Sequence, residues 1–170
     1  MGGTVRLIAM KSCDGSPGSL VEVGSFGGDS NVHPDDGGTT DICLSLDWSN
    51  RSTGCADPRL VVSHLHGSVS ILKLRASTGY GGPPEAATVS LDSEPSSRSS
   101  ALEVEHHFTA HTFAPGIVPE VWIAAWNCHN DSVFCTGAED GKLKLWDIRT
   151  GTSSPIVSVE AHSGSGVTTC

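Results

Sequence analysis

Residues 133–149 constrain the fold more than any other segment, because they read Val-Phe-Cys-Thr-Gly-Ala-Glu-Asp-Gly-Lys-Leu-Lys-Leu-Trp-Asp-Ile-Arg. Two short runs rich in β-forming residues flank the dipeptide Asp140 and Gly141, and the second run closes with Trp146 and Asp147. Glycine in a two-residue turn supplies the positive φ that a tight β-hairpin requires. The segment therefore predicts two antiparallel strands joined by a tight turn.

The chain contains a second copy of this arrangement. Each unit reads strand, loop, strand, tight turn, strand, and each turn carries a glycine, Gly67 in the first unit and Gly141 in the second. The predicted strands are 42–48, 59–63 and 68–75 in the first unit and 121–126, 133–136 and 142–149 in the second. A repeat of this kind that ends in Trp-Asp is typical of WD repeats, in which each propeller blade is a four-stranded sheet.

The remaining apolar runs complete these blades and begin others. We expect an outer fourth strand at 102–108 for the first unit and at 156–159 for the second, with another strand starting at 166–170. Upstream, 4–9 and 20–23 are expected as an inner and an outer strand of a preceding blade. The predicted fold class is all-β, a partial WD40-type β-propeller of about two complete blades and parts of two flanking blades. The predicted divisions are 1–24 (end of a preceding blade), 25–40 (a Gly/Asp-rich loop), 41–108 (first complete blade), 109–160 (second complete blade) and 161–170 (first strand of a further blade).

Composition agrees with this interpretation. The 170 residues include 20 Gly and 9 Pro, and only 17% are charged, which suits many short strands better than long helices. Residues 76–100 are rich in Gly, Pro and Ser and are predicted as a disordered insertion in the first blade. A solvated linker is favoured there over a recognition loop. We expect the chain to be a fragment, a truncated gene model or a partial isoform, because a closed ring needs more blades.

The net charge, the apolar runs and the cysteines limit the possible binding partners and the cellular location. The net charge of -9 argues against nucleic acid as a partner, since phosphate binding needs clustered Lys and Arg. No apolar run is long enough to span a bilayer, so we predict no membrane association and a cytoplasmic location. The six cysteines form no Cys-x-x-Cys pair, and free thiols are the expected state. They are Cys13, Cys43, Cys55, Cys128, Cys135 and Cys170.

Four residues of the second unit are predicted to form one hydrogen-bonded network. His111, Thr136, Asp140 and Trp146 occupy the positions at which WD repeats place His, Ser/Thr, Asp and Trp. A buried Asp in a tight turn needs donors, which a His ring and an indole N–H can supply. We interpret this set as blade scaffolding rather than as a catalytic Asp-His dyad. The first unit has His66 and Leu72 at the Asp and Trp positions, so we expect no such network there.

Histidine pairs raise the alternative of metal binding. If both lie on one strand, His64 and His66 point to the same face, whereas His106, His107 and His111 are spaced less favourably. No carboxylate or Cys is placed to complete either set, so neither a metal nor a cofactor is expected. The chain also lacks a Gly-x-Ser-x-Gly elbow and a phosphate-binding loop.

The run Glu120-Val-Trp-Ile-Ala-Ala-Trp126, followed by 133–149, Ala161-His162 and Gly166-Val167, is more specific than a generic repeat. It resembles the WD-repeat family of diphthamide biosynthesis, the methylated-diphthine methylesterases, also called diphthine methyltransferases. The resemblance covers mostly residues 41–75 and 105–170. It implies hydrolysis of the methyl ester of methylated diphthine on elongation factor 2, which would be the protein partner.

No motif of that family identifies catalytic residues in this chain. Ester hydrolysis needs a polarised carbonyl and an activated water or nucleophile, and His64 and His66 are the candidate bases. The 170-residue chain by itself is expected to be inactive and prone to aggregation, because open blade faces stay exposed. The alternative function is a non-catalytic WD-repeat scaffold that mediates protein–protein interactions.

Overall fold

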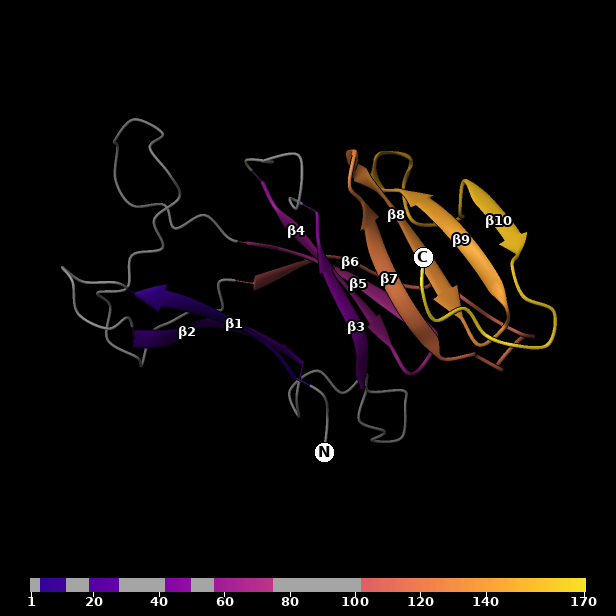
Figure 1. Cartoon of the computed structure of the whole chain (residues 1–170), viewed down its shortest axis with the longest axis horizontal. Helices are drawn as coiled ribbons and strands as arrows, with labels where there is room; N and C mark the ends of the chain where they lie inside the picture. Colours follow the sequence, from indigo (N-terminus) through magenta and orange to yellow (C-terminus); the bar gives the residue numbers. More distant parts are fainter. Residues whose placement is uncertain (1–3, 12–18, 28–41, 50–56, 75–101) are drawn as a thin grey trace.

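The computed structural model describes residues 4–11, 19–27, 42–49, 57–74 and 102–170. The predicted insertion at 76–100 lies outside the described residues, as does all but the start of the predicted loop at 25–40. The described parts are almost entirely β-structure, arranged as two four-stranded antiparallel sheets and one two-stranded hairpin (Figure 1). The prediction of an all-β fold is therefore confirmed.

The first sheet follows the chain in simple up-and-down order. Its strands are β3 (Cys43–Trp48), β4 (Arg59–His64), β5 (Ser68–Leu74) and β6 (Leu102–Thr109). The central strands β4 and β5 are mostly buried, whereas β6 alternates between partly buried and exposed residues, as an outer strand does. The fourth strand expected at 102–108 thus forms, one residue longer than predicted.

The second sheet repeats this order. Its strands are β7 (Val121–Asn127), β8 (Asn130–Ala138), β9 (Lys142–Asp147) and β10 (Val157–Glu160). The strand predicted to run to Arg149 ends two residues earlier, at Asp147. The Asp147 carboxylate accepts a hydrogen bond from the Arg149 backbone N–H and caps a short 3-10 turn, η3 (Ile148–Thr150), which diverts the chain from the sheet.

Equivalent turns close both sheets in the same way. Gly67 and Gly141 have φ of 72° and 71°, the left-handed conformation that the predicted hairpin turns require. The carbonyl of Gly67 accepts from the backbone N–H groups of Ala110 and His111, and the carbonyl of Gly141 accepts from those of Ala161 and His162. The internal repeat seen in the sequence is therefore also a repeat of backbone hydrogen bonds.

A buried apolar cluster joins the two sheets. The first sheet contributes β-branched side chains and the second contributes aromatic ones, with β7 lying against β3 and β4 (Figure 1). The residues are Val61, Val69 and Ile71 from the first sheet and Val121, Ala124, Trp126, Phe134, Ala138 and Trp146 from the second, with Ala110 between them. Burial of this apolar surface stabilises the stacking of the sheets.

Polar side chains of β3 also bind the edge of β7. The backbone N–H of Ala124 donates to Ser45 Oγ at 2.8 Å, and that of Trp126 donates to Asp47 Oδ2 at 2.9 Å. These N–H groups belong to the edge of the second sheet that faces the first sheet. The two bonds therefore satisfy edge donors that would otherwise be buried without partners.

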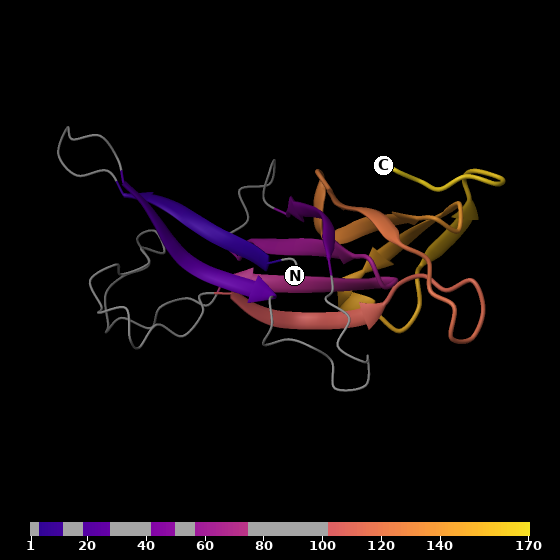
Figure 2. The ribbon, with the colours of Figure 1, turned by 90° about the horizontal axis from the view of Figure 1, so that it is seen from below.

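The N-terminal strands form a hairpin. Strands β1 (Thr4–Lys11) and β2 (Ser19–Gly27) pair directly with each other and are longer than predicted, so that β2 crosses the boundary placed at residue 24. The first sheet lies between this hairpin and the second sheet in both views (Figure 1, Figure 2).

The strand predicted at 166–170 is not formed. Val167 donates one backbone hydrogen bond to the Ala138 carbonyl at the end of β8, but the described residues show no continuous ladder of hydrogen bonds along 166–170. This part of the prediction is wrong for the chain as described.

Candidate functional site

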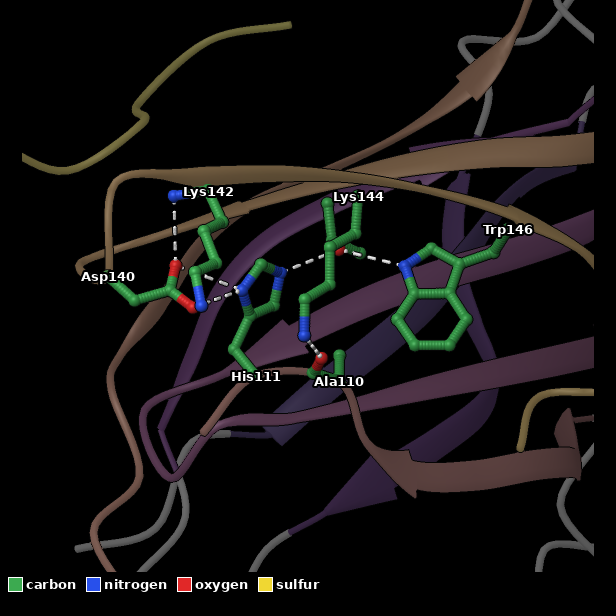
Figure 3. Close-up of polar contacts among 7 residues, drawn as sticks. Ala110, His111, Asp140, Lys142, Lys144 and Trp146 are labelled. Carbon is green, nitrogen blue, oxygen red and sulfur yellow. Dashed lines mark hydrogen bonds and ion pairs between the residues drawn. The ribbon is translucent and has the colours of Figure 1, made fainter. Parts of the chain in front are cut away.

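The structure brings the four predicted network residues together at the junction of the sheets (Figure 3). His111 follows β6 at the end of the first sheet, and its Nδ1 lies 3.0 Å from Asp140 Oδ2 in the β8–β9 turn. Its Nε2 lies 2.8 Å from Thr136 Oγ1 on β8. Trp146 Nε1 on β9 donates to the same hydroxyl at 2.9 Å. One hydrogen-bonded chain therefore links the first sheet to two strands and a turn of the second.

The direction of each hydrogen bond follows from the donors available. A carboxylate only accepts, so His111 Nδ1 carries the proton toward Asp140. In a neutral imidazole Nε2 must then accept, and the Thr136 hydroxyl donates to it while accepting from Trp146. With His111 neutral, both ring nitrogens of His111, the Thr136 hydroxyl and Trp146 Nε1 all have hydrogen-bond partners.

Burial favours the same protonation state. The side chains of His111 and Asp140 are 0% and 2% exposed. Desolvation by burial lowers the pKa of His111, and the Asp140 carboxylate opposes this only in part. Lys144 lies close by and donates to the Ala110 carbonyl at 2.7 Å, and burial lowers its pKa too (Figure 3). Burial therefore favours the neutral imidazole of His111 over its protonated form.

The order Asp140, His111, Thr136 is that of a carboxylate, an imidazole and a hydroxyl in a nucleophilic triad. Two observations oppose that function here. Thr136 and His111 are fully buried, so no substrate carbonyl can reach the hydroxyl. The hydroxyl also accepts from Trp146, which uses one of its two lone pairs and holds the oxygen in the interior. The geometry suits a structural tie between sheets.

His64, one of the two candidate bases, lies in a second polar set that crosses all four strands of the first sheet. Its Nε2 lies 2.8 Å from Ser70 Oγ, and Ser70 Oγ lies 2.9 Å from His107 Nδ1. Cys43 Sγ lies 3.9 Å from His64 Nδ1. We name Cys43, His64, Ser70 and His107 the polar row. His64 is buried, Ser70 is fully buried and His107 is exposed, so the row runs from the interior to the surface.

His66, the other candidate base, is not on the same strand face as His64. Strand β4 ends at His64, and His66 lies in the turn before Gly67, where it is half-buried. The prediction that the two rings share a face is wrong, because the alternation of a strand stops where the turn begins. Of the two, His66 is the more accessible to a substrate.

The histidines do not form a metal site in the part of the chain that the structure describes. No group of three or more His, Cys, Asp or Glu side chains is placed to hold a metal ion there. His107 binds Ser70 and His111 binds Asp140, so the predicted triplet with His106 is divided between two separate sets.

Ser70 and His107 are residues that sequence reasoning did not join to His64. The pairing of Ser70 with His107 depends on the register of β5 against β6, and the insertion at 76–100 separates these strands in sequence. Alternation within β5 places Ser70 and Leu72 on the same face of the sheet. That alternation could have predicted the face on which Ser70 lies, but not that His107 is its hydrogen-bond partner.

These features define the chain as an all-β protein of two stacked four-stranded antiparallel sheets joined by a buried polar network, consistent with a partial β-propeller. Among the described residues, no helix is long and apolar enough to cross a membrane.

Comparison with curated proteins finds a distant similarity to a diphthamide-pathway protein. A diphthine methyltransferase homolog of Dictyostelium discoideum is 25% identical over 107 residues, which are 63% of this chain and 20% of that protein. The chain thus spans about a fifth of the length of the relative. No family model matches the chain.

Proposed function

We propose that the chain forms part of a WD-repeat β-propeller that acts in diphthamide biosynthesis, where it hydrolyses the methyl ester of methylated diphthine on elongation factor 2. The observation that carries this proposal is the similarity to the diphthine methyltransferase homolog, which extends over 63% of the chain. The two stacked sheets add support, because adjacent blades of a propeller would have this strand order and this packing. In this proposal 41–108 and 109–160 are the two complete blades, and the enzyme is cytoplasmic.

The chemistry of the proposed step places demands on the site. Water must attack the ester carbonyl, methanol must leave, and a base must remove a proton from the water. His66 meets the requirement of access because it is half-buried in the turn between β4 and β5. His64 is buried with both ring nitrogens facing partners, so it serves to position the turn rather than to contact substrate.

The alternative is a non-catalytic WD-repeat scaffold that mediates protein–protein interactions. One observation favours it: the loop between the sheets is a tight hairpin with an apolar tip. Phe113 N–H and Ile117 N–H donate to the carbonyls of Ile117 and Ala114, and Phe113, Ile117 and Val118 are 53%, 59% and 41% exposed. Exposed apolar side chains on a well-formed loop are a feature of interaction surfaces.

Complementation tests the proposal. The longest reading frame that contains this chain is expressed in cells that lack the methylesterase, and the modified histidine peptide of elongation factor 2 is analysed by mass spectrometry. We expect diphthamide to be restored. Accumulation of methylated diphthine, with the protein present in soluble form, would contradict the enzyme and favour the scaffold.

Two variants distinguish loss of the proposed base from loss of the folded structure. His66→Gln is expected to abolish the rescue without lowering the thermal midpoint. Cys128→Ser, in the exposed β7–β8 turn, is expected to keep full rescue. Full rescue by His66→Gln would exclude His66 as the base while leaving the pathway assignment intact.

A further inference from the structure

The loop between the two sheets contains a segment that the equivalent loop after the second sheet lacks. In the first loop the carbonyls of His111 and Pro119 both lie against the β4–β5 turn. A Cβ added at Gly67 would lie 3.0 Å from the His111 oxygen and 3.2 Å from the Pro119 oxygen. Residues 112–118 lie between these two anchor points and leave the turn.

The loop after the second sheet makes the same contacts with fewer residues. The carbonyls of His162 and Ser165 lie against Gly141, the turn glycine of the second sheet. Only Ser163 and Gly164 separate these two anchor points, and neither has an apolar side chain. The contacts of the loop with the turn therefore do not require the additional residues of 112–118.

Residues 112–118 form a hairpin with a fixed base and an apolar, exposed tip, and we name them the apolar hairpin. The anchor residues His111 and Pro119 are fully buried. At the tip, the Phe113 N–H donates to the Ile117 carbonyl at 2.9 Å, while Phe113, Ile117 and Val118 are 53%, 59% and 41% exposed. Apolar surface that is left in water gains free energy when a partner covers it.

The apolar hairpin lies at the same end of the first sheet as the proposed base. Val118 Cβ would be 2.9 Å from a Cβ at Gly67, and His66 is the residue before Gly67 in that turn. Sites for small molecules are concave and enclose most of the ligand. A projecting hairpin instead contacts the surface of a large partner, so its position beside His66 favours a protein that reaches both.

From this geometry we infer that the apolar hairpin binds an apolar surface of the protein substrate close to the modified histidine, while His66 acts on the ester. The inference rests on the function proposed above, because it takes elongation factor 2 as that substrate. It divides the work between binding by Phe113 and Ile117 and chemistry by His66. Loss of the apolar tip should therefore weaken substrate binding without changing the chemical step.

The test compares wild type with the double variant Phe113→Ser/Ile117→Ser, both expressed from the longest reading frame that contains this chain. Biolayer interferometry measures the Kd for elongation factor 2 that carries methylated diphthine, and the same proteins are assayed for hydrolysis. We expect the Kd to rise about tenfold or more, the KM to rise with it, and kcat and the thermal midpoint to stay unchanged. Each single variant should give a smaller rise in Kd.

Val104→Ser is the matched control, because Val104 is 45% exposed on the outer strand β6, and it should leave the Kd unchanged. Three results would each overturn the inference: no binding of elongation factor 2 by wild type, an equal Kd for the double variant, or an equal loss for Val104→Ser. A wild-type dimer that the double variant dissociates on gel filtration would also overturn it, since the hairpin would then bind a second copy. Binding that depends on the hairpin but is not followed by hydrolysis would support the inference and contradict the esterase.

Discussion

His111 Nδ1 lies 3.0 Å from Asp140 Oδ2, so a residue at the end of the first sheet is tied to a turn of the second. His162 follows β10 as His111 follows β6, and each donates its backbone N–H to the glycine of the preceding tight turn. The His111 contact thus connects the end of the first sheet to the second sheet. Stability of the pair of sheets should depend on it.

Replacing Thr136 by Val should be among the most damaging changes to the network. It leaves Trp146 Nε1 and His111 Nε2 buried without partners while preserving side-chain shape. Each of the two unsatisfied groups costs about 1–3 kcal/mol, so we expect a loss of roughly 2–6 kcal/mol in the free energy of unfolding. Urea denaturation measures it, with Thr136→Ser as the control that keeps the hydroxyl. Equal stability of the two variants would contradict the network.

The depressed pKa of His111 predicts a pH dependence. An unfolded His with pKa near 6.5 takes up a proton before the folded, buried His111 does. Stability conferred by His111 is therefore complete above pH 6.5 and decreases as the pH falls through the lower pKa of the folded state. The slope cannot exceed about 1.4 kcal/mol per pH unit for one proton.

The measurement compares urea denaturation of wild type and His111→Gln across this range. Other histidines titrate in both proteins, so the difference between the two curves isolates His111. We expect the difference to diminish toward acid pH. Parallel curves would show that His111 does not favour its neutral form in the fold.

Substitution of two glycines separates backbone strain from steric collision. Gly141 and Gly151 both have positive φ, 71° and 90°. A Cβ at Gly141 would collide with the His162 carbonyl oxygen, whereas a Cβ at Gly151 would meet nothing within 4 Å. Gly151→Ala should cost about 1–3 kcal/mol for strain alone, since Gly151 has φ 90° and ψ 167°, and Gly141→Ala should cost more because the collision adds to the strain. Thermal unfolding of both variants measures this, and equal losses would refute the close packing of that turn.

Asp47 provides a test of the contact between β3 and β7. Its Oδ2 accepts from the Trp126 N–H at 2.9 Å, and Asp47→Ala would leave that edge donor without its acceptor. We expect a loss of about 1–3 kcal/mol on urea denaturation, and a smaller loss for Asp47→Asn, which keeps an oxygen acceptor. If Asp47→Asn were as destabilising as Asp47→Ala, charge rather than the hydrogen bond would be responsible.

Much of this architecture could be predicted from local patterns. Alternating apolar residues and the two turn glycines placed the strands of both sheets, and the match of Thr136 and Asp140 to WD-repeat positions around the turn indicated the network. These features depend on residues close in sequence, where the periodicity of a strand determines which side chains share a face.

Features that depend on pairing between distant segments were missed. The polar row requires the register of β5 against β6, and the packing of Val167 against Gly137 requires the path of 161–170 over β8. The early end of β9 depends on the competition of the Asp147 side chain for the Arg149 N–H, which a pattern of apolar residues does not report.

Hydrolysis of the ester by the protein itself is the most direct test of the proposed function. Elongation factor 2 carrying methylated diphthine is incubated with the protein expressed from the longest reading frame that contains this chain, and its intact mass is followed. We predict loss of the ester methyl group with release of methanol, and no reaction with the 170-residue chain alone. An unchanged substrate mass in the presence of the longer, folded protein would contradict the account.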